Sequence, residues 1–262
     1  QNRVTGESQK SDKFTYRTAA LYRFDFGLAP YVSYSTSFEP QGTFSDPAGN
    51  QVFADPSLGK QLEAGAKYQV PGTSILLTGA WFRIDQSNVI TYGPNFAFAT
   101  QTGKVRSRGV EVEASAPLPY DFNLRFAFSR QKLRVIEDAN PANIGKGILG
   151  VGRGGTSANL EWAPKQGALA GFAIGGAVRH VDRVYAGTYF DGVTRNTPSY
   201  TLFDALARYD MGALSPGLRN ITLAVNATNI FDKKHITSCY LDYGWCWYGN
   251  RRTVQGTIGF HW

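Results

Sequence analysis

The final stretch of the chain, residues 253–262, alternates strictly between two kinds of side chain. Val254, Ile258, Phe260 and Trp262 fall on one face together with Gly256, and hydroxyl, amide and imidazole groups fall between them. A period of two predicts a β-strand with one apolar and one polar face. A closing strand that carries Phe and Trp is typical of an outer-membrane barrel, where it faces lipid and its last aromatic residue lies at the interface.

Composition favours the same fold class. The 262 residues include 29 Gly and only one Met, and 14% are aromatic, which favours strands over helices. The longest apolar stretch, 167–178, is interrupted by glycines and is too short to cross a bilayer as a helix, so a helical membrane protein is excluded. The net charge is +7, but Lys and Arg are scattered. We therefore expect no nucleic-acid partner, and these residues would suit an anionic outer-membrane surface.

The alternation seen at the end recurs along the whole chain. It predicts about eleven antiparallel strands of roughly ten residues, the length that crosses a bilayer at a tilt. In one of them, 74–85, the apolar face is ambiguous, because Leu76, Phe82 and Ile84 compete with Leu77 and Trp81. The expected strands are 14–24, 31–38, 62–68, 74–85, 110–116, 122–129, 157–162, 172–180, 202–211, 221–228 and 253–262.

The connections between these strands alternate in length. Short turns are expected at 27–30, 71–73, 117–121, 164–168 and 212–218, and long loops at 39–59, 86–106, 135–155, 183–199 and 231–251. Outer-membrane barrels have short periplasmic turns and long outer loops, whereas a soluble β-sandwich needs no such regularity. The loop 135–155 contains a formal G-x-G-x-x-G at 145–150, but no helix follows it, so a dinucleotide site is not predicted.

An odd number of strands leaves this barrel incomplete. Bacterial single-chain barrels are even-numbered, and an open sheet edge within lipid leaves backbone groups unpaired. The chain also opens without a signal peptide. We therefore expect a mature or truncated C-terminal part of a longer barrel.

Several connecting sequences resemble those of TonB-dependent siderophore receptors. They are 31–40 (YVSYSTSFEP), 101–111 (QTGKVRSRGVE), 198–204 (PSYTLFD), 226–234 (NATNIFDKK) and the terminal aromatic strand. The resemblance implies that residues 1–262 are all barrel domain, the C-terminal half of a 22-stranded barrel whose lumen is plugged. The plug, the TonB box and the first half-barrel have no counterpart in this sequence.

The resemblance also implies a function and a set of partners. A ferric siderophore would bind at the outer side of a Gram-negative outer membrane and pass inward when the TonB–ExbB–ExbD complex pulls the plug. The remaining partners would be outer-membrane lipid and lipopolysaccharide, with a monomeric full-length protein and no cofactor. Three alternatives stay open: a TonB-dependent receptor for another ligand, a plugless passive porin or adhesin barrel, and a soluble β-sandwich binding module. No catalytic triad, carboxylate pair or nucleophile elbow indicates an enzyme.

Cys239 and Cys246, the two cysteines of the chain, lie in the last long loop. Disulfides form in the oxidising environment outside the cell, which favours a disulfide here. Free thiols and metal ligation remain alternatives, although no His or further Cys stands at zinc spacing.

The same loop is rich in aromatic residues. Rigid aromatic side chains with polar tips suit a siderophore chelate, although a self-packed loop or an aromatic girdle would need the same residues. The Cys-aromatic pairs most resemble hydroxamate (ferrichrome-type) receptors, which makes Tyr240 the leading ligand contact. The expected ligand-binding residues are Tyr240, Tyr243, Trp245 and Trp247, with Tyr92 and Phe96 as weaker candidates.

Charged residues at the start of the strand 110–116 suggest ion pairs inside the barrel. Arg106 and Arg108 belong to the 101–111 motif, and Glu111 and Glu113 lie on the polar face of the strand. We expect the two arginines to form ion pairs in the lumen, with contact to a plug as the less favoured alternative.

Overall fold

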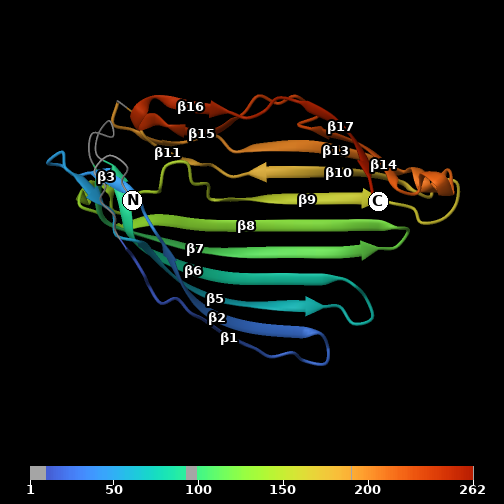
Figure 1. The fold of residues 1–262 in the computed structure, drawn as a ribbon, viewed down its shortest axis with the longest axis horizontal. Coiled ribbons are helices and arrows are strands. Elements are labelled where there is room, and N and C mark those ends of the chain that lie inside the picture. The colour runs from blue at the N-terminus through green and yellow to red at the C-terminus, as the bar shows by residue number, and fades with distance from the viewer. Residues whose placement is uncertain (1–9, 93–98, 190, 262) are drawn as a thin grey trace.

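The computed structural model describes residues 10–92, 99–189 and 191–261, and Trp262 lies outside this part. A single antiparallel sheet of eleven strands forms a curved, open wall in which each strand pairs with its neighbours in chain order (Figure 1). The strands are β1 (Arg17–Leu21), β2 (Leu28–Glu39), β5 (Ser57–Gln69), β6 (Leu76–Tyr92), β7 (Ala99–Leu118), β8 (Phe122–Glu137), β9 (Gly154–Trp162), β10 (Phe172–Val181), β13 (Tyr200–Asp210), β14 (Ile221–Thr228) and β17 (Thr253–Phe260).

The eleven predicted strands are thus confirmed, and the β-sandwich alternative is wrong because the strands make one sheet rather than two packed sheets. None of the helices among the described residues is both long and apolar enough to cross a membrane.

The connections differ from the prediction in detail. The segment 86–106 was expected to be a loop, but β6 and β7 extend through most of it and pair beyond Ser87. The sequence hides this extension because the apolar alternation fades where strands leave the bilayer. Leu28 to Pro30 were expected in a turn and instead begin β2, paired with β5.

Three of the long loops contain small hairpins. These are β3 (Thr43–Ser45) with β4 (Gln51–Phe53), β11 (Tyr185–Thr188) with β12 (Thr194–Asn196), and β15 (Ile236–Tyr240) with β16 (Trp245–Tyr248). Labelled strands of all three lie at the long-loop end of the wall, opposite the end that holds the C-terminus (Figure 1). This end is the outer mouth of the barrel wall.

Strand register assigns the two faces of the wall. Across the sheet, Leu77 of β6 lies opposite Ala114, which lies opposite Phe126, and Trp81 lies opposite Val110. Directly opposed residues share a face, so Leu77 and Trp81 belong to the apolar outward face. The ambiguity in 74–85 is thereby resolved, with Phe82 and its neighbours of the same parity facing inward.

Aromatic residues on the inner face lie over glycines of adjacent strands. Phe82 covers Gly109, where an added Cβ would lie 2.5 Å from the Cζ of Phe82, and Tyr31 similarly covers Gly65. Aromatic side chains that cover glycines in neighbouring strands help to fix strand register. Polar pairs complete the inner face, including Arg179 with Asp204 at 2.6 Å.

The predicted lumen position of Arg106 and Arg108 is wrong. Both share the parity of Val110 and Val112, so they lie on the outward face, whereas Glu111 and Glu113 face inward. Strand parity alone separates the four residues, because no bulge interrupts β7 between Arg106 and Glu113. Arg106 pairs with Asp85, which belongs to the same outward face.

Candidate functional site

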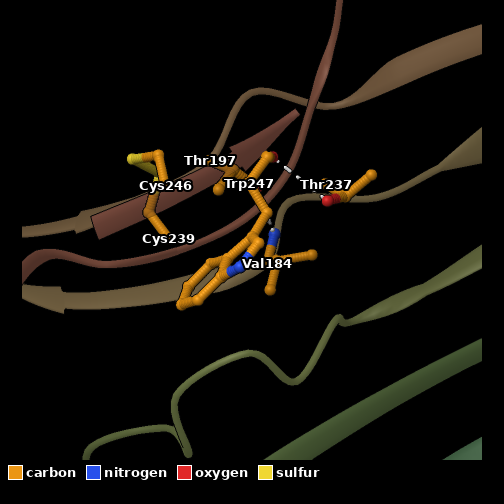
Figure 2. The surroundings of a disulfide bond; sticks show 6 residues. All are labelled: Val184, Thr197, Thr237, Cys239, Cys246 and Trp247. Atoms are coloured by element: carbon orange, nitrogen blue, oxygen red, sulfur yellow. Dashed lines mark hydrogen bonds between the residues drawn. A yellow bond between two sulfur atoms is a disulfide. The ribbon is translucent and has the colours of Figure 1, made fainter. Parts of the chain in front are cut away.

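The β15–β16 hairpin carries the predicted aromatic loop. Cys239 and Cys246 lie opposite one another in the hairpin and form a disulfide, so that prediction is confirmed (Figure 2). The hydroxyl of Thr237 donates to the carbonyl oxygen of Trp247 at 3.1 Å. Between the strands, residues Leu241–Tyr243 form one 3-10 turn, which ends at Gly244 in the left-handed region with φ of 71°.

Removing the disulfide is expected to loosen the hairpin rather than the sheet. A disulfide that closes a ring this small stabilises the folded state by roughly 2–3 kcal/mol, because it lowers the conformational entropy of the unfolded chain. In the double variant C239S/C246S, we expect amide exchange to accelerate within 236–248 while peptides from β17 keep their rates. Hydrogen exchange read by mass spectrometry measures both at once, and unchanged exchange in the hairpin would contradict the expectation.

The base of the hairpin is anchored by two polar residues at the end of β14. Asn229, 3% exposed, donates from Nδ2 to the carbonyl oxygens of Lys233 and Asn250 at 2.9 and 3.1 Å. Asp232 accepts hydrogen bonds from the Arg251 side chain and from the Arg252 backbone N–H. These contacts lower the pKa of Asp232 to about 2, with the Arg251 hydrogen bond as the largest cause.

The lowered pKa predicts a pH dependence for this anchor. A carboxylate whose folded pKa lies below its unfolded value of about 3.9 stabilises the fold above that value and loses the effect as pH falls through the folded pKa. We therefore expect the anchor to hold from pH 7 to about pH 4 and to loosen between about pH 4 and pH 2. Limited pepsin digestion, normalised with a disordered peptide, should show new cuts within 229–252 in this window. Asp232→Asn should lack the transition, and the expectation fails if this variant shows the same step.

The carboxylate of Asp242 accepts a hydrogen bond that links the hairpin to β11. Asp242 Oδ1 accepts from the backbone N–H of Thr188 at 2.5 Å. The approach is close because Gly187 has no Cβ, which would otherwise lie 2.7 Å from the same oxygen. Burial and the nearby Asp242 charge raise the pKa of Tyr185 and of Tyr243. Both phenols therefore keep their protons at neutral pH and can donate hydrogen bonds.

A cavity of about 400 Å³ lies between this hairpin, the loop after β8 and the outer ends of β6 and β7. Tyr240 and Tyr243, two of the residues predicted from the sequence, line it. Its remaining wall combines aliphatic and polar residues: Val89, Ile90, Gly103, Val105, Val135, Asp138, Asn143, Lys146, Gly147, Ile148, Leu149, Tyr185, Thr188 and Asp242. Val105 and Val135 are buried on the inner face, so the cavity opens on the lumen side of the wall at its outer mouth.

The other predicted residues lie elsewhere. Trp245 and Trp247 do not line the cavity, but they contact the tyrosines that do: the Tyr240 and Trp247 ring centroids are 5.1 Å apart, and those of Tyr243 and Trp245 are 5.8 Å apart. The backbone of Tyr92 ends β6, and its side chain lies outside the described part of the chain, as does the whole of Phe96.

Sequence reasoning missed the role of the glycine run at 145–150. A Cβ at Gly147 would lie 2.9 Å from the Tyr185 ring, and one at Gly150 would lie 3.1 Å from the Tyr240 ring. The two glycines therefore let the loop after β8 pack against Tyr185 and Tyr240, two of the three tyrosines that line the cavity. The run of glycines was visible in the sequence, but its aromatic partners lie far away along the chain.

Asp242, Tyr185, Asp138 and Lys146 were missed as well. Asp242 stands between two predicted aromatic residues, which was the one available signal, whereas the other three become neighbours only through loop packing. Among the residues that the structure describes, no group of three or more His, Cys, Asp or Glu side chains is placed to hold a metal ion.

Comparison with known proteins assigns the chain to a family. Residues 1–230 match the family model described as "TonB dependent receptor-like, beta-barrel". The chain therefore belongs to the TonB-dependent receptors, and it forms part of the wall of an outer-membrane barrel.

Two relatives of known function are similar to the chain over most of its length. It is 34% identical to the ferrioxamine B receptor of Salmonella typhimurium, over 93% of this chain and 33% of the relative. It is also 34% identical to the ferrichrome outer membrane transporter/phage receptor of Escherichia coli K12, over 99% of this chain and 34% of the relative. The chain thus spans about one third of the length of these relatives, which are receptors and transporters rather than enzymes.

Solved structures share the fold at lower identity. The outer-membrane ferripyoverdine receptor of Pseudomonas aeruginosa superimposes with a TM-score of 0.75 at 21% identity, over 96% of this chain and 33% of the receptor. The ferric-catecholate import receptor Fiu of E. coli K12 gives 0.71 at 21% identity, over 95% of this chain and 35% of the receptor. At these identities the likeness establishes the fold alone.

Proposed function

We propose that the protein containing this chain imports a ferric hydroxamate siderophore across the outer membrane in a TonB-dependent manner. Within it, residues 1–262 serve as barrel domain and supply wall together with outer ligand-binding loops. The observation that carries the proposal is the cavity at the outer mouth, in which Tyr240 and Tyr243 meet aliphatic residues on the lumen side. Apolar lining with a few convergent polar groups is the usual character of a small-molecule site.

The charges of the cavity support the hydroxamate class. Its described lining contains two carboxylates, Asp138 and Asp242, and one cation, Lys146, but no arginine. The residues between β6 and β7 in the sequence, 93–98, include no ionisable side chain. Iron held by three hydroxamates carries no net charge, whereas a tris-catecholate complex is strongly anionic. Electrostatic complementarity therefore favours a neutral or cationic chelate.

Uptake by cells tests the proposal. The full-length receptor is expressed in a Gram-negative strain that lacks its own siderophore receptors, and radioactive iron is supplied as a trihydroxamate or as a tris-catecholate. We expect uptake of the hydroxamate complex only, and a protonophore should abolish it. Hydroxamate uptake that persists with the protonophore would instead support a passive porin, and preference for the catecholate would overturn the assigned ligand class.

A further inference from the structure

The cavity at the outer mouth carries charges that the chain itself does not neutralise. Asp138, Lys146 and Asp242 line it, and the ion pairs within the described part of the chain include none of these three residues. Lys146 offsets one of the two carboxylates, so the lining keeps a net negative charge. A ligand that fills the cavity therefore meets an uncompensated anion.

The carboxylate of Asp242 is held in place and can still accept a hydrogen bond. Its Oδ1 accepts from the backbone N–H of Thr188, and among the described residues no side chain or N–H donates to its Oδ2. The residue is exposed and lines the cavity. Asp242 can therefore accept a hydrogen bond from a molecule bound there, with no change in the contact that links the hairpin to β11.

Asp138 adds a second negative charge with one oxygen shielded from water. Its Oδ1 accepts from the backbone N–H of Asn140 at 2.8 Å and from the side-chain amide of Asn143 at 3.2 Å. Its Oδ2 is buried and has no hydrogen-bond partner within the part of the chain that the structure describes. Solvent screens a buried charge less than an exposed one, so a cation in the cavity would be attracted by Asp138 even without touching it.

Three tyrosines, Tyr185, Tyr240 and Tyr243, line the same cavity. After burial, the charge of Asp242 is the largest cause that raises the pKa of Tyr185 and of Tyr243, which indicates that this carboxylate lies near both phenols. Aromatic ring faces attract cations. A carboxylate beside several tyrosine rings is therefore suited to an organic ammonium group.

A metal ion fits this wall less well than an organic cation. Hard metal ions take six or more oxygen ligands, and within the described ranges no three His, Cys, Asp or Glu side chains are grouped to hold one. An alkylammonium group needs only one charge-assisted hydrogen bond and contact with ring faces. The cation that this cavity accommodates is thus part of the organic ligand.

We propose that the cavity selects ferric trihydroxamates that carry a pendant protonated amine. This inference rests on the function proposed above, since the iron chelate is the ligand class assigned there. The amine donates a hydrogen bond to Asp242 and lies against the rings of Tyr185 and Tyr243, and Asp138 attracts it from the opposite part of the lining. Asp242 is accordingly the residue that determines specificity between charged and uncharged chelates.

A pair of chelates that differ only in this charge tests the proposal. The full-length receptor in detergent is titrated by calorimetry with a linear ferric trihydroxamate that ends in a primary amine, and with the same chelate after N-acetylation. We expect the wild type to prefer the amine by at least about tenfold, the value of a hydrogen bond to a charged group. Asp242→Asn keeps an oxygen that can accept from Thr188, so it should lose this preference and bind the acetylated chelate as the wild type does.

Two further variants separate charge from folding and from position. Asp138→Asn should lower the preference by about threefold, because it removes a charge that acts at a distance. Asp55→Asn serves as the matched control: Asp55 is exposed in the loop before β5 and does not line the cavity, so this variant should keep the wild-type preference.

The outcomes distinguish this inference from the function on which it rests. If the wild type binds both chelates with equal affinity, the selection of an amine is wrong, although the hydroxamate class stands. If it binds neither chelate, the hydroxamate class is wrong as well. A preference that persists in Asp242→Asn would come from the size of the acetyl group rather than from charge, and an equal loss in Asp55→Asn would show that any carboxylate at the mouth has the same effect; either result would overturn the inference.

Discussion

Phe126→Arg is expected to destabilise the membrane-embedded receptor by about 2–4 kcal/mol, the cost of an arginine on the lipid face near the bilayer midplane. Phe126 lies in the middle of the outward apolar row of β8, which runs from Phe122 to Phe128 and ends at Arg130. Neither the charge nor the hydrogen-bonding groups of the new side chain would find partners there. Urea unfolding of the full-length receptor in lipid vesicles measures the change as a lowered midpoint.

The next residue along the strand provides a matched control. Ala127 faces inward, and its register partner across the sheet is Glu113. In Ala127→Arg the new cation gains a carboxylate neighbour on the polar lumen side, so we expect a change below about 1 kcal/mol. Equal destabilisation by the two substitutions would mean that the two faces of the wall have been assigned incorrectly.

This contrast also explains why the fold could be predicted from the sequence. Within the bilayer, each strand has one face in lipid and one in a polar lumen. The alternation of apolar and polar side chains therefore predicts both the position of each strand and the direction in which its side chains point. In residues 122–128, Phe and Leu on the lipid face alternate with Asn, Arg and Ala on the lumen face. The same signal failed at 86–106, because strands that rise above the bilayer are no longer required to carry apolar residues on one face.

The error at Arg106 and Arg108 has the same physical origin. Charged residues were expected to avoid the outward face, but that rule applies only within the hydrocarbon core. At the level of the headgroups an outward arginine is favourable, and strand parity relative to Val110 decides its face. The parity could be read from the sequence, whereas the height of these residues above the apolar rows requires the register of three strands.

The candidate site was predictable only in part, because it is built by contacts between loops. The disulfide hairpin and Tyr240 could be identified by resemblance and residue type. Tyr185, Lys146 and the two glycines that receive aromatic rings come from other loops, and local patterns contain no information about which loops meet. The expected effects of substitutions at this site are therefore argued from the contacts seen in the structure.

Tyr240→Ala is expected to weaken binding of a ferric trihydroxamate by about tenfold to a hundredfold, as for an aromatic anchor that becomes buried when the ligand binds. The Tyr240 ring lines the cavity, packs edge-on against Trp247 and covers Gly150. Truncation removes an apolar wall of the site and also the contact that holds the loop after β8 in place. Calorimetric titration of the full-length receptor measures the affinity, and Tyr240→Phe separates the hydroxyl from the ring.

Tyr248 on the same hairpin serves as the control for this prediction. Its side chain is 76% exposed and lines no part of the cavity, so Tyr248→Ala should bind the chelate with an affinity close to that of the wild type. If both alanine variants weaken binding equally, the effect comes from general loosening of the hairpin and the cavity is not the ligand site. If Tyr240→Ala alone weakens binding, while hydrogen exchange stays unchanged both in 236–248 and in the loop 138–153, the ring of Tyr240 contacts the chelate directly.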